Sequence, residues 1–238
     1  MSCVLTHDAL RRGSKRVLEP AELHFPASAV VGVIGENGAG KSTLFLALAD
    51  ALRRGNGTAR ITLSSGSAHV CFMPQEPALP PWLTVREAIE LWTNSAIGDD
   101  ISDRLQVGAL LPRFVGSLSG GEQQAVALAA VIARAGDILV LDEPFAHLDF
   151  RRRLAAIELL SSQVPKRTLT LVSSQNAADL AAFCTWYLVL AGGRVAFHGS
   201  IGELLGSVPA TAAHRVSALE GRLVELLDMR REGDWIAE

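Results

Sequence analysis

Lysine is scarce in this sequence, and most of its basic residues are arginines. The lysines are Lys15, Lys41 and Lys166, within 22 lysines and arginines against 25 aspartates and glutamates. The formal net charge is therefore −3 at pH 7. Proteins that bind nucleic acid through its phosphates generally carry a strongly basic surface. The charge balance thus argues against nucleic acid as a partner.

Long hydrophobic runs are also missing, although 49% of the residues are hydrophobic and the mean hydropathy is +0.26. The longest uncharged apolar run covers residues 125–133, whereas a membrane-spanning helix needs about 20 residues. We therefore expect a sizeable core and no membrane span. The N-terminal residues include His7 and Asp8 and lack the apolar block of a signal peptide, so none is expected.

Cysteine is rare, and its spacing argues against a disulfide or zinc framework. Cys3, Cys71 and Cys184 are odd in number, far apart and never in a Cys-x-x-Cys pair. This pattern is typical of reduced thiols in a cytosolic protein. We expect them to pack as small apolar residues.

Short apolar runs alternate with helical segments along the chain. Residues 29–34 are predicted to form a buried strand, and residues 41–54 a buried helix that stops at Gly55. Further strands are expected at residues 60–63, 69–73, 138–141, 169–172 and 187–190. A turn at residues 64–67 separates the first two of these strands. Strands that alternate with helices predict an α/β fold with a parallel sheet.

Three other helical regions have recognisable patterns. A hydroxyl residue followed three positions later by glutamate forms a capping box in two places, Thr84 with Glu87 and Ser119 with Glu122. These helices are expected to reach residues 92 and 134, and residues 99–114 between them are expected to be helical in part. Near the C-terminus, apolar residues at helical spacing predict an amphipathic helix: Val216, Leu219, Leu223, Leu226 and Leu227. The pattern favours packing on its own domain over binding to a partner.

A glycine-rich loop carries the strongest chemical signal. Residues 35–42 fit the pattern G-x-x-x-x-G-K-[ST] and lie between a predicted strand and a predicted helix. The glycines let successive N–H groups point toward an anion at the helix N-terminus. Lys41 would reach the β- and γ-phosphates of a nucleotide, and Ser42 would place its hydroxyl on Mg²⁺. A chance glycine loop is the alternative, which the flanking strand and helix disfavour.

Two carboxylates follow the apolar run 138–141. Asp142 and Glu143 would lie at the C-terminal end of a strand, where α/β sheets hold their ligands. Asp142 is a candidate to hold Mg²⁺, directly or through water, and Glu143 is a candidate base for an attacking water. By itself the pair is more typical of a solvated acidic turn, but its combination with the phosphate loop favours nucleotide hydrolysis.

Further motifs follow in order. Residues 118–124 match an LSGGQ-type signature, and residues 72–76 look like a glutamine loop centred on Gln75. Residues 83–87 resemble an LTVxEN stretch, and Leu148-Asp149 match a D-loop. Gly193, Arg194, Val195 and Gly199 resemble a closing strand and turn. With the phosphate loop and the acidic pair, this series resembles the ATP-binding cassette (ABC) family over roughly residues 17–205, specifically the nucleotide-binding subunit of ABC transporters.

The resemblance implies a fold of the α/β class, a P-loop NTPase core with a mostly parallel sheet and an N-terminal antiparallel β portion. An α-helical signature subdomain would be inserted at about residues 76–134. Residues 1–205 would form a single ABC ATPase domain, and residues 206–238 a C-terminal amphipathic helical tail. Two chains would pair head to tail around two ATP molecules, with Ser119 and Gly121 on the γ-phosphate of the partner's nucleotide. Gln75 would sense Mg²⁺ and the attacking water beside a groove for an integral-membrane subunit.

The site residues implied by the family fall into three groups. The catalytic group is Lys41, Gln75, Glu143 and Gln175. The ATP-binding group is Gly35, Glu36, Asn37, Gly38, Ala39, Gly40, Lys41, Ser42, Thr43, Ser119, Gly120, Gly121 and Asp149. The Mg²⁺ ligands are Ser42, Gln75 and Asp142.

The sequence departs from the family at three places. Gln175 stands where a histidine is usual and Asn176 where an aspartate is usual, so hydrolysis is expected to be slow, because an amide cannot shuttle a proton. The aromatic residue that stacks on adenine is missing. Arg12 or a neighbour takes its place, either stacking on the base or lying in a solvated basic loop. Ala125 and Ala130 replace arginines common after the signature.

These features predict an ATP-hydrolysing subunit that couples to separate membrane subunits at the cytoplasmic face of a membrane. A non-transport ATPase of the same family is one alternative, although the interval between residues 75 and 118 is too short for a long coiled-coil insertion. A second alternative is the hydrolysis-poor half of a heterodimeric cassette pair.

Overall fold

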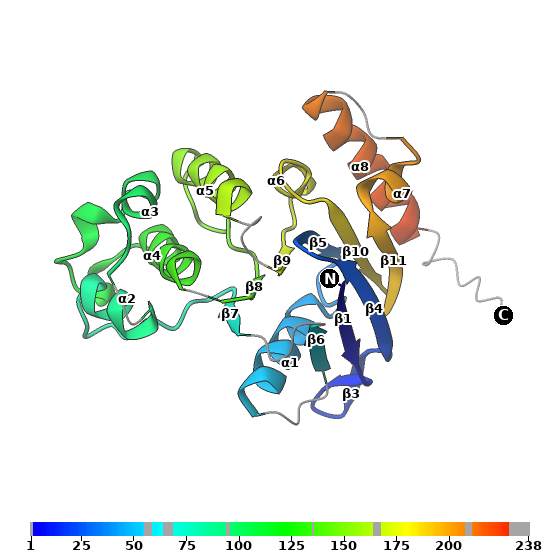
Figure 1. The fold of residues 1–238 in the computed structure, drawn as a ribbon, viewed down its shortest axis with the longest axis horizontal. Helices are drawn as coiled ribbons and strands as arrows, with labels where there is room; N and C mark the ends of the chain where they lie inside the picture. Colours follow the sequence, from blue (N-terminus) through cyan, green and yellow to red (C-terminus); the bar gives the residue numbers. More distant parts are fainter. Residues whose placement is uncertain are drawn as a thin grey trace.

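A six-stranded sheet forms the centre of the molecule in the computed structural model (Figure 1), which describes residues 2–54, 59–63, 69–93, 96–134, 136–163, 168–207 and 211–228. The strand order is β11-β10-β5-β9-β8-β7, and every neighbouring pair is parallel except β10 and β11. The strands are β5 (Ala29–Gly35), β7 (Val70–Met73), β8 (Ile138–Leu141), β9 (Leu169–Ser173), β10 (Trp186–Ala191) and β11 (Arg194–Ser200). The predicted mostly parallel α/β sheet is confirmed.

The alternation of side chains along these strands divides the core in two. In β5, Val31 and Val33 belong to one buried cluster, while Val30 and Ile34 belong to the other. Because successive side chains of a strand point to opposite faces, apolar residues at every position bury both faces of the sheet. The continuous apolar runs in the sequence have this origin.

A second, antiparallel sheet, with the strand order β4-β1-β6, packs on the buried cluster that contains Val31 and Val33. Its strands are β1 (Ser2–His7), β4 (Ala21–Pro26) and β6 (Ala59–Leu63), and a separate hairpin joins β2 (Leu10–Arg12) to β3 (Lys15–Leu18). Helix α1 (Lys41–Arg54) contributes Leu44, Phe45 and Leu48 to the cluster between the sheets. The expected N-terminal antiparallel portion is therefore present.

The strands β6 and β7 belong to different sheets. Strand β6 pairs with β1 in the antiparallel sheet, and β7 pairs with β8 in the central sheet. Both strands exist close to their predicted positions, but their pairing depends on partners distant in sequence. The predicted turn at 64–67 lies outside the described residues.

A group of helices extends from the β7 edge of the central sheet (left in Figure 1). It contains α2 (Val85–Thr93), α3 (Asp99–Arg104) and α4 (Gly120–Ala133), with short 3₁₀ turns at Gly108–Leu110 and Val115–Ser117. Thr84 and Ser119 cap α2 and α4 through the predicted boxes with Glu87 and Glu122. Both capping predictions are confirmed.

The remaining helices follow the sheet strands toward the C-terminus. They are α5 (Phe150–Gln163), α6 (Ala177–Ala181), α7 (Ile201–Leu205) and α8 (Ala212–Asp228). Leu219 and Leu223 of α8 are buried in the larger core cluster, and α8 lies against α6, α7 and β11. The amphipathic helix thus packs on its own domain.

The sequence predicts neither a disulfide framework nor a membrane-spanning helix. Cys3, Cys71 and Cys184 are all buried, and no disulfide joins them. Across the described ranges, none of the helices is long and apolar enough to traverse a bilayer.

Candidate functional site

The glycine-rich loop joins β5 to α1 and has the backbone conformation of an anion cradle. Gly38 and Gly40 have φ values of +85° and +106°, where side chains are rarely tolerated. A Cβ on Gly40 would lie 2.7 Å from the Leu18 side chain, and one on Gly35 would lie 2.5 Å from the Leu190 carbonyl oxygen. The loop is therefore built for glycine at these positions, and its N–H groups can approach a phosphate closely.

Lys41 lies at the start of α1 with its side chain turned back over the loop. It is 8% exposed, and Nζ donates hydrogen bonds to the carbonyl oxygens of Gly35 at 2.7 Å and Glu36 at 3.3 Å. Burial lowers the pKa of Lys41, while the Glu143 and Asp142 carboxyls act to raise it. An anion placed in the loop would satisfy this buried ammonium better than two carbonyls do.

Asp142 and Glu143 follow β8, as predicted, and Ser173 at the end of β9 connects them. The Ser173 hydroxyl donates to Asp142 Oδ1 at 2.7 Å, and its oxygen accepts from the Glu143 amide at 2.8 Å. Asp142 is 3% exposed. Its carboxylate is consequently fixed in position at the carboxyl edge of the sheet, close to the phosphate loop.

Glu143 is held in a strained backbone conformation by contacts from two other segments. Its φ is +48°, which is unfavourable for a residue with a side chain. Gln124 of α4, 1% exposed, donates from Nε2 to the carbonyl oxygens of Glu143 at 3.1 Å and Pro144 at 3.3 Å. The Gln175 amide donates to Glu143 Oε2 at 3.2 Å. Burial raises the pKa of Glu143, against the lowering effects of the Gln175 amide and Lys41.

A cavity of about 870 Å³ brings these groups together. Its lining includes most of the predicted nucleotide and metal residues: Glu36, Asn37, Gly38, Ala39, Gly40, Lys41, Ser42, Thr43, Gln75, Asp142, Glu143 and Gln175. The side chains of Ser42, Gln75 and Asp142 offer hydroxyl, amide and carboxylate oxygens, the donor types that Mg²⁺ prefers. Within the described ranges, no group of three histidine, cysteine, aspartate or glutamate residues forms another metal-binding cluster.

The predicted adenine side of the cavity is basic. Arg12, Lys15 and Arg16 of the β2–β3 hairpin line it, together with Gly192 and Gly193. Arg16 is engaged by Glu19 at 3.0 Å. The structure thus places Arg12, the candidate for the adenine contact, on the wall of the cavity.

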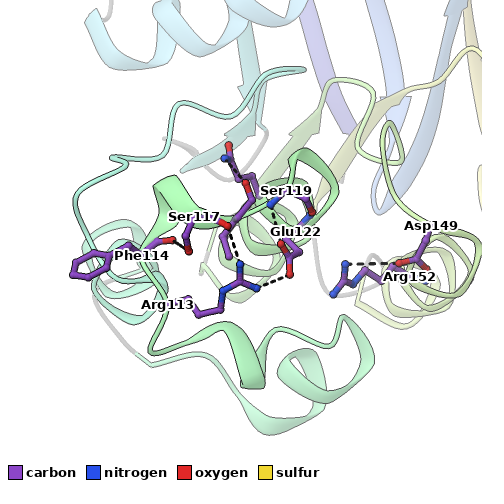
Figure 2. A network of polar contacts seen from close by, with 9 residues as sticks. Arg113, Phe114, Ser117, Ser119, Glu122, Asp149 and Arg152 are labelled. Carbon is purple, nitrogen blue, oxygen red and sulfur yellow. Dashed lines mark hydrogen bonds and ion pairs between the residues drawn. The ribbon is translucent and has the colours of Figure 1, made fainter.

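The signature residues lie apart from this cavity. Ser119, Gly120 and Gly121 at the start of α4 are not among its lining residues, and Ser119 is exposed. Asp149 is also outside the cavity, and its side chain accepts from the Arg152 amide at 2.9 Å at the start of α5. The Arg152 guanidinium pairs with the same carboxylate at 3.7 Å (Figure 2). A Cβ on Gly121 would lie 2.5 Å from the His147 carbonyl oxygen, so the signature packs tightly on the D-loop.

Sequence inspection did not identify Ser173, Gln124 or the pair formed by Arg153 and Asp179. Arg153 of α5 meets the buried Asp179 at 2.6 Å, and Ser174 Oγ also donates to Asp179, at 3.4 Å. Ser174 in turn accepts from the Asn176 amide at 3.1 Å, so contacts that run through Ser174 to Asp179 and Arg153 hold the loop that carries Gln175. The nearest signal in the sequence is the polar run after β9, which contains Ser173 and Ser174 but does not specify which residues they contact.

Comparisons with known proteins agree with this arrangement. Residues 18–146 match the ABC transporter family. The cobalamin import ATP-binding protein BtuD of Halobacterium salinarum is 31% identical over 242 residues, covering 87% of this chain and 61% of that protein. The thiamine import ATP-binding protein ThiQ of Salmonella typhimurium is 35% identical over 199 residues, covering 77% of this chain and 85% of that protein.

Solved structures show the same fold. An ATP-binding subunit of an ABC transporter superposes with a TM-score of 0.71 at 22% identity, covering 94% of this chain and 99% of that one. RNase-L Inhibitor superposes with a TM-score of 0.69 at 29% identity, covering 84% of this chain and 40% of that one. The chain therefore belongs to the ABC transporter family, whose ATP-binding subunits are ATPases.

Proposed function

We propose that this chain is the ATP-hydrolysing subunit of an ABC importer whose membrane-spanning subunits are separate polypeptides. The observation that carries the proposal is the cavity in which the phosphate loop, Gln75 and Glu143 converge. The names of the relatives, which are cobalamin and thiamine import proteins, support import as the direction.

In the proposed reaction, the loop N–H groups and Lys41 bind the β- and γ-phosphates. Glu143 accepts a proton from a water molecule as its oxygen attacks the γ-phosphorus, and the bond to the β–γ bridging oxygen breaks. Ser42, Gln75 and Asp142 would hold Mg²⁺, which supplies charge neutralisation at the phosphates. Gln175 would donate a hydrogen bond to the γ-phosphate.

The proposal includes a head-to-tail dimer. Ser119 and Gly121 are remote from the cavity of their own chain, so they are free to contact the γ-phosphate of a nucleotide bound by a second chain. The N-terminus of α4 adds the positive end of a helix dipole. Each chain would then supply half of two ATP sites, with Asp149 also at the interface.

A second contact, with the membrane subunits, would place the protein at the cytoplasmic face of a membrane. Trp82 and Phe114 in the helical group are 73% and 58% exposed. Their segments are adjacent, since the Gly116 amide donates to the Pro81 carbonyl oxygen at 3.0 Å. Exposed aromatic side chains on adjacent segments are suited to a protein interface.

The test combines hydrolysis with partner identification. Purified chain is expected to hydrolyse ATP with a rate that rises more than linearly with protein concentration, because each site needs two chains. A tagged chain purified from its native membrane is expected to bring integral-membrane subunits with it. Absence of both results would reject the proposal, and recovery of a different cassette chain would favour a heterodimer.

The heterodimer alternative rests on Gln175, and one substitution addresses it. Gln175→His is expected to raise the rate of ATP hydrolysis about tenfold or more, because an imidazole can move a proton and carry positive charge. The backbone bond from residue 175 to Glu143 should survive the substitution, since it uses the amide N–H. Steady-state phosphate release from wild type, Gln175→His and the control Gln175→Ala measures the effect. Equal rates for wild type and Gln175→His would show that the glutamine does not slow hydrolysis.

A further inference from the structure

The signature carries a glutamate, and an arginine outside the signature holds it. Arg113 donates from Nη1 to Glu122 Oε1 and from Nη2 to the Ser117 carbonyl oxygen, both at 2.8 Å (Figure 2). The Glu122 side chain is 19% exposed and that of Arg113 is 41% exposed. The guanidinium thus bridges the carboxylate to the backbone just before the signature.

The other carboxylate oxygen of Glu122 belongs to the capping box of α4. Oε2 accepts from the Ser119 amide at 2.8 Å, and the Glu122 amide donates to Ser119 Oγ at 3.3 Å. Hydrogen bonds from the Ser119 amide and the Ser119 side chain, and further the Arg113 guanidinium, hold the pKa of Glu122 below its ordinary value. The carboxylate is therefore charged at neutral pH and lies next to the serine of the signature.

We propose that Arg113 is a positioning residue for ATP-dependent dimerisation: it holds the Glu122 carboxylate and neutralises its charge beside Ser119, so that the γ-phosphate of the partner's ATP can approach the signature serine. Without Arg113, the carboxylate would place an uncompensated negative charge beside a polyanion. The inference rests on the proposed head-to-tail dimer.

The experiment measures dimer formation by size-exclusion chromatography with light scattering, at increasing ATP, in a Glu143→Gln background that blocks hydrolysis. Arg113→Ala is expected to weaken the ATP-dependent dimer about tenfold or more, the effect of losing a charge-assisted hydrogen bond. Arg113→Lys should restore the dimer in part, because an ammonium supplies the positive charge but lacks the planar guanidinium that bonds Glu122 and the Ser117 carbonyl together. Binding of ATP to the monomer, measured by fluorescence titration at low protein concentration, is expected to stay within about twofold of wild type.

A matched control and a rescue separate this role from a merely structural one. Arg104 pairs with Asp100 at 2.7 Å in the same helical group, and Arg104→Ala is expected to leave the dimer unchanged. The double variant Arg113→Ala/Glu122→Gln should regain most of the lost dimerisation, because a neutral side chain needs no compensating cation. If Arg113→Ala fails to fold, the single variant Glu122→Gln still tests the inference, since it should dimerise at least as well as its parent.

The outcomes are distinguishable. If the parent with Arg113 intact forms no dimer with ATP, the proposed head-to-tail pairing of two copies of this chain is wrong. If the parent dimerises and Arg113→Ala behaves like Arg104→Ala, the role of Arg113 is wrong. If Arg113→Ala weakens the dimer and the double variant shows no recovery, Arg113 merely supports the subdomain and the inference is overturned.

Discussion

Replacing Glu143 by glutamine is expected to reduce ATP hydrolysis by about two to three orders of magnitude, while ATP binding persists. The carboxylate is the proposed acceptor of the proton from the attacking water, and an amide cannot take that proton. The phosphate loop and Lys41 remain intact in the variant, so the affinity for nucleotide should change little. Without turnover, the dimer closed around ATP should accumulate.

The backbone around Glu143 makes this substitution a clean one. Its strained φ of +48° is held by bonds from Gln124 to main-chain carbonyls and by the bond from the Glu143 amide to Ser173. None of these bonds uses the Glu143 side chain. Glutamine has nearly the same shape and can still accept from the Gln175 amide.

Phosphate release and nucleotide-dependent dimerisation measured on the same preparations check this expectation. Glu90→Gln, an acid-to-amide change at an exposed position of α2, serves as the control and should hydrolyse ATP at the wild-type rate. A Glu143→Gln variant that retains wild-type hydrolysis would remove Glu143 from the role of base. An unmutated chain that is trapped equally well as a dimer would favour the hydrolysis-poor half of a heterodimer.

The parts of the site that could be predicted from the sequence are those formed by residues that lie close together in it. The phosphate loop is one such part, because a single stretch between a strand and a helix supplies both the cradle and Lys41. The capping box at Ser119 is another, since its partners lie three residues apart. Local spacing is visible in a sequence, and both features appear in the structure at the expected residues.

The supports of Glu143 could not be predicted in the same way. Ser173 lies 30 residues from Glu143 and Gln124 lies 19 residues away. Each is brought in by the sheet order or by the packing of α4 against β7, and neither has a distinctive local pattern. The placement of β6 and β7 in different sheets could not be predicted for the same reason, because strand pairing joins residues that are distant in the sequence and the alternation of side chains does not specify it.

The sequence predicts the role of the basic residues that line the cavity less clearly than it predicts the role of the phosphate loop. Arg12 was a candidate for the adenine contact, and the structure places it on the cavity wall with Lys15 and Arg16. The position follows from the β2–β3 hairpin, whose register brings Arg12 opposite Lys15. A guanidinium plane at this place suits stacking on a base, but it also suits contact with phosphate.

Replacing Lys41 by methionine is expected to weaken ATP binding at least about 100-fold, equivalent to about 2.8 kcal/mol. Methionine keeps an unbranched apolar stem in the buried position and removes the ammonium. Nζ is within hydrogen-bond distance of the loop carbonyls of Gly35 and Glu36, where bound phosphates would be its neighbours. Buried, charge-assisted bonds to phosphate are among the stronger polar contacts in proteins, so their loss should dominate the affinity.

The stability of the fold should change far less than the affinity. Burial lowers the pKa of Lys41, which means that keeping this buried side chain charged costs free energy when no phosphate is bound. Methionine removes that cost, although it leaves the two carbonyls without the ammonium. Thermal unfolding without nucleotide is therefore expected to be close to wild type, whereas the stabilisation that ATP confers on wild type should disappear.

Isothermal titration with ATP and Mg²⁺ checks the affinity, and Lys15→Ala provides a matched control. Lys15 lines the same cavity but lies exposed on the hairpin, so its loss should weaken binding by no more than about fivefold. A Lys41→Met variant that binds ATP as well as Lys15→Ala does would mean that the loop amides alone hold the phosphates. The cradle formed around Gly38 and Gly40 would then be the binding determinant, with the buried lysine reserved for the transition state of phosphoryl transfer.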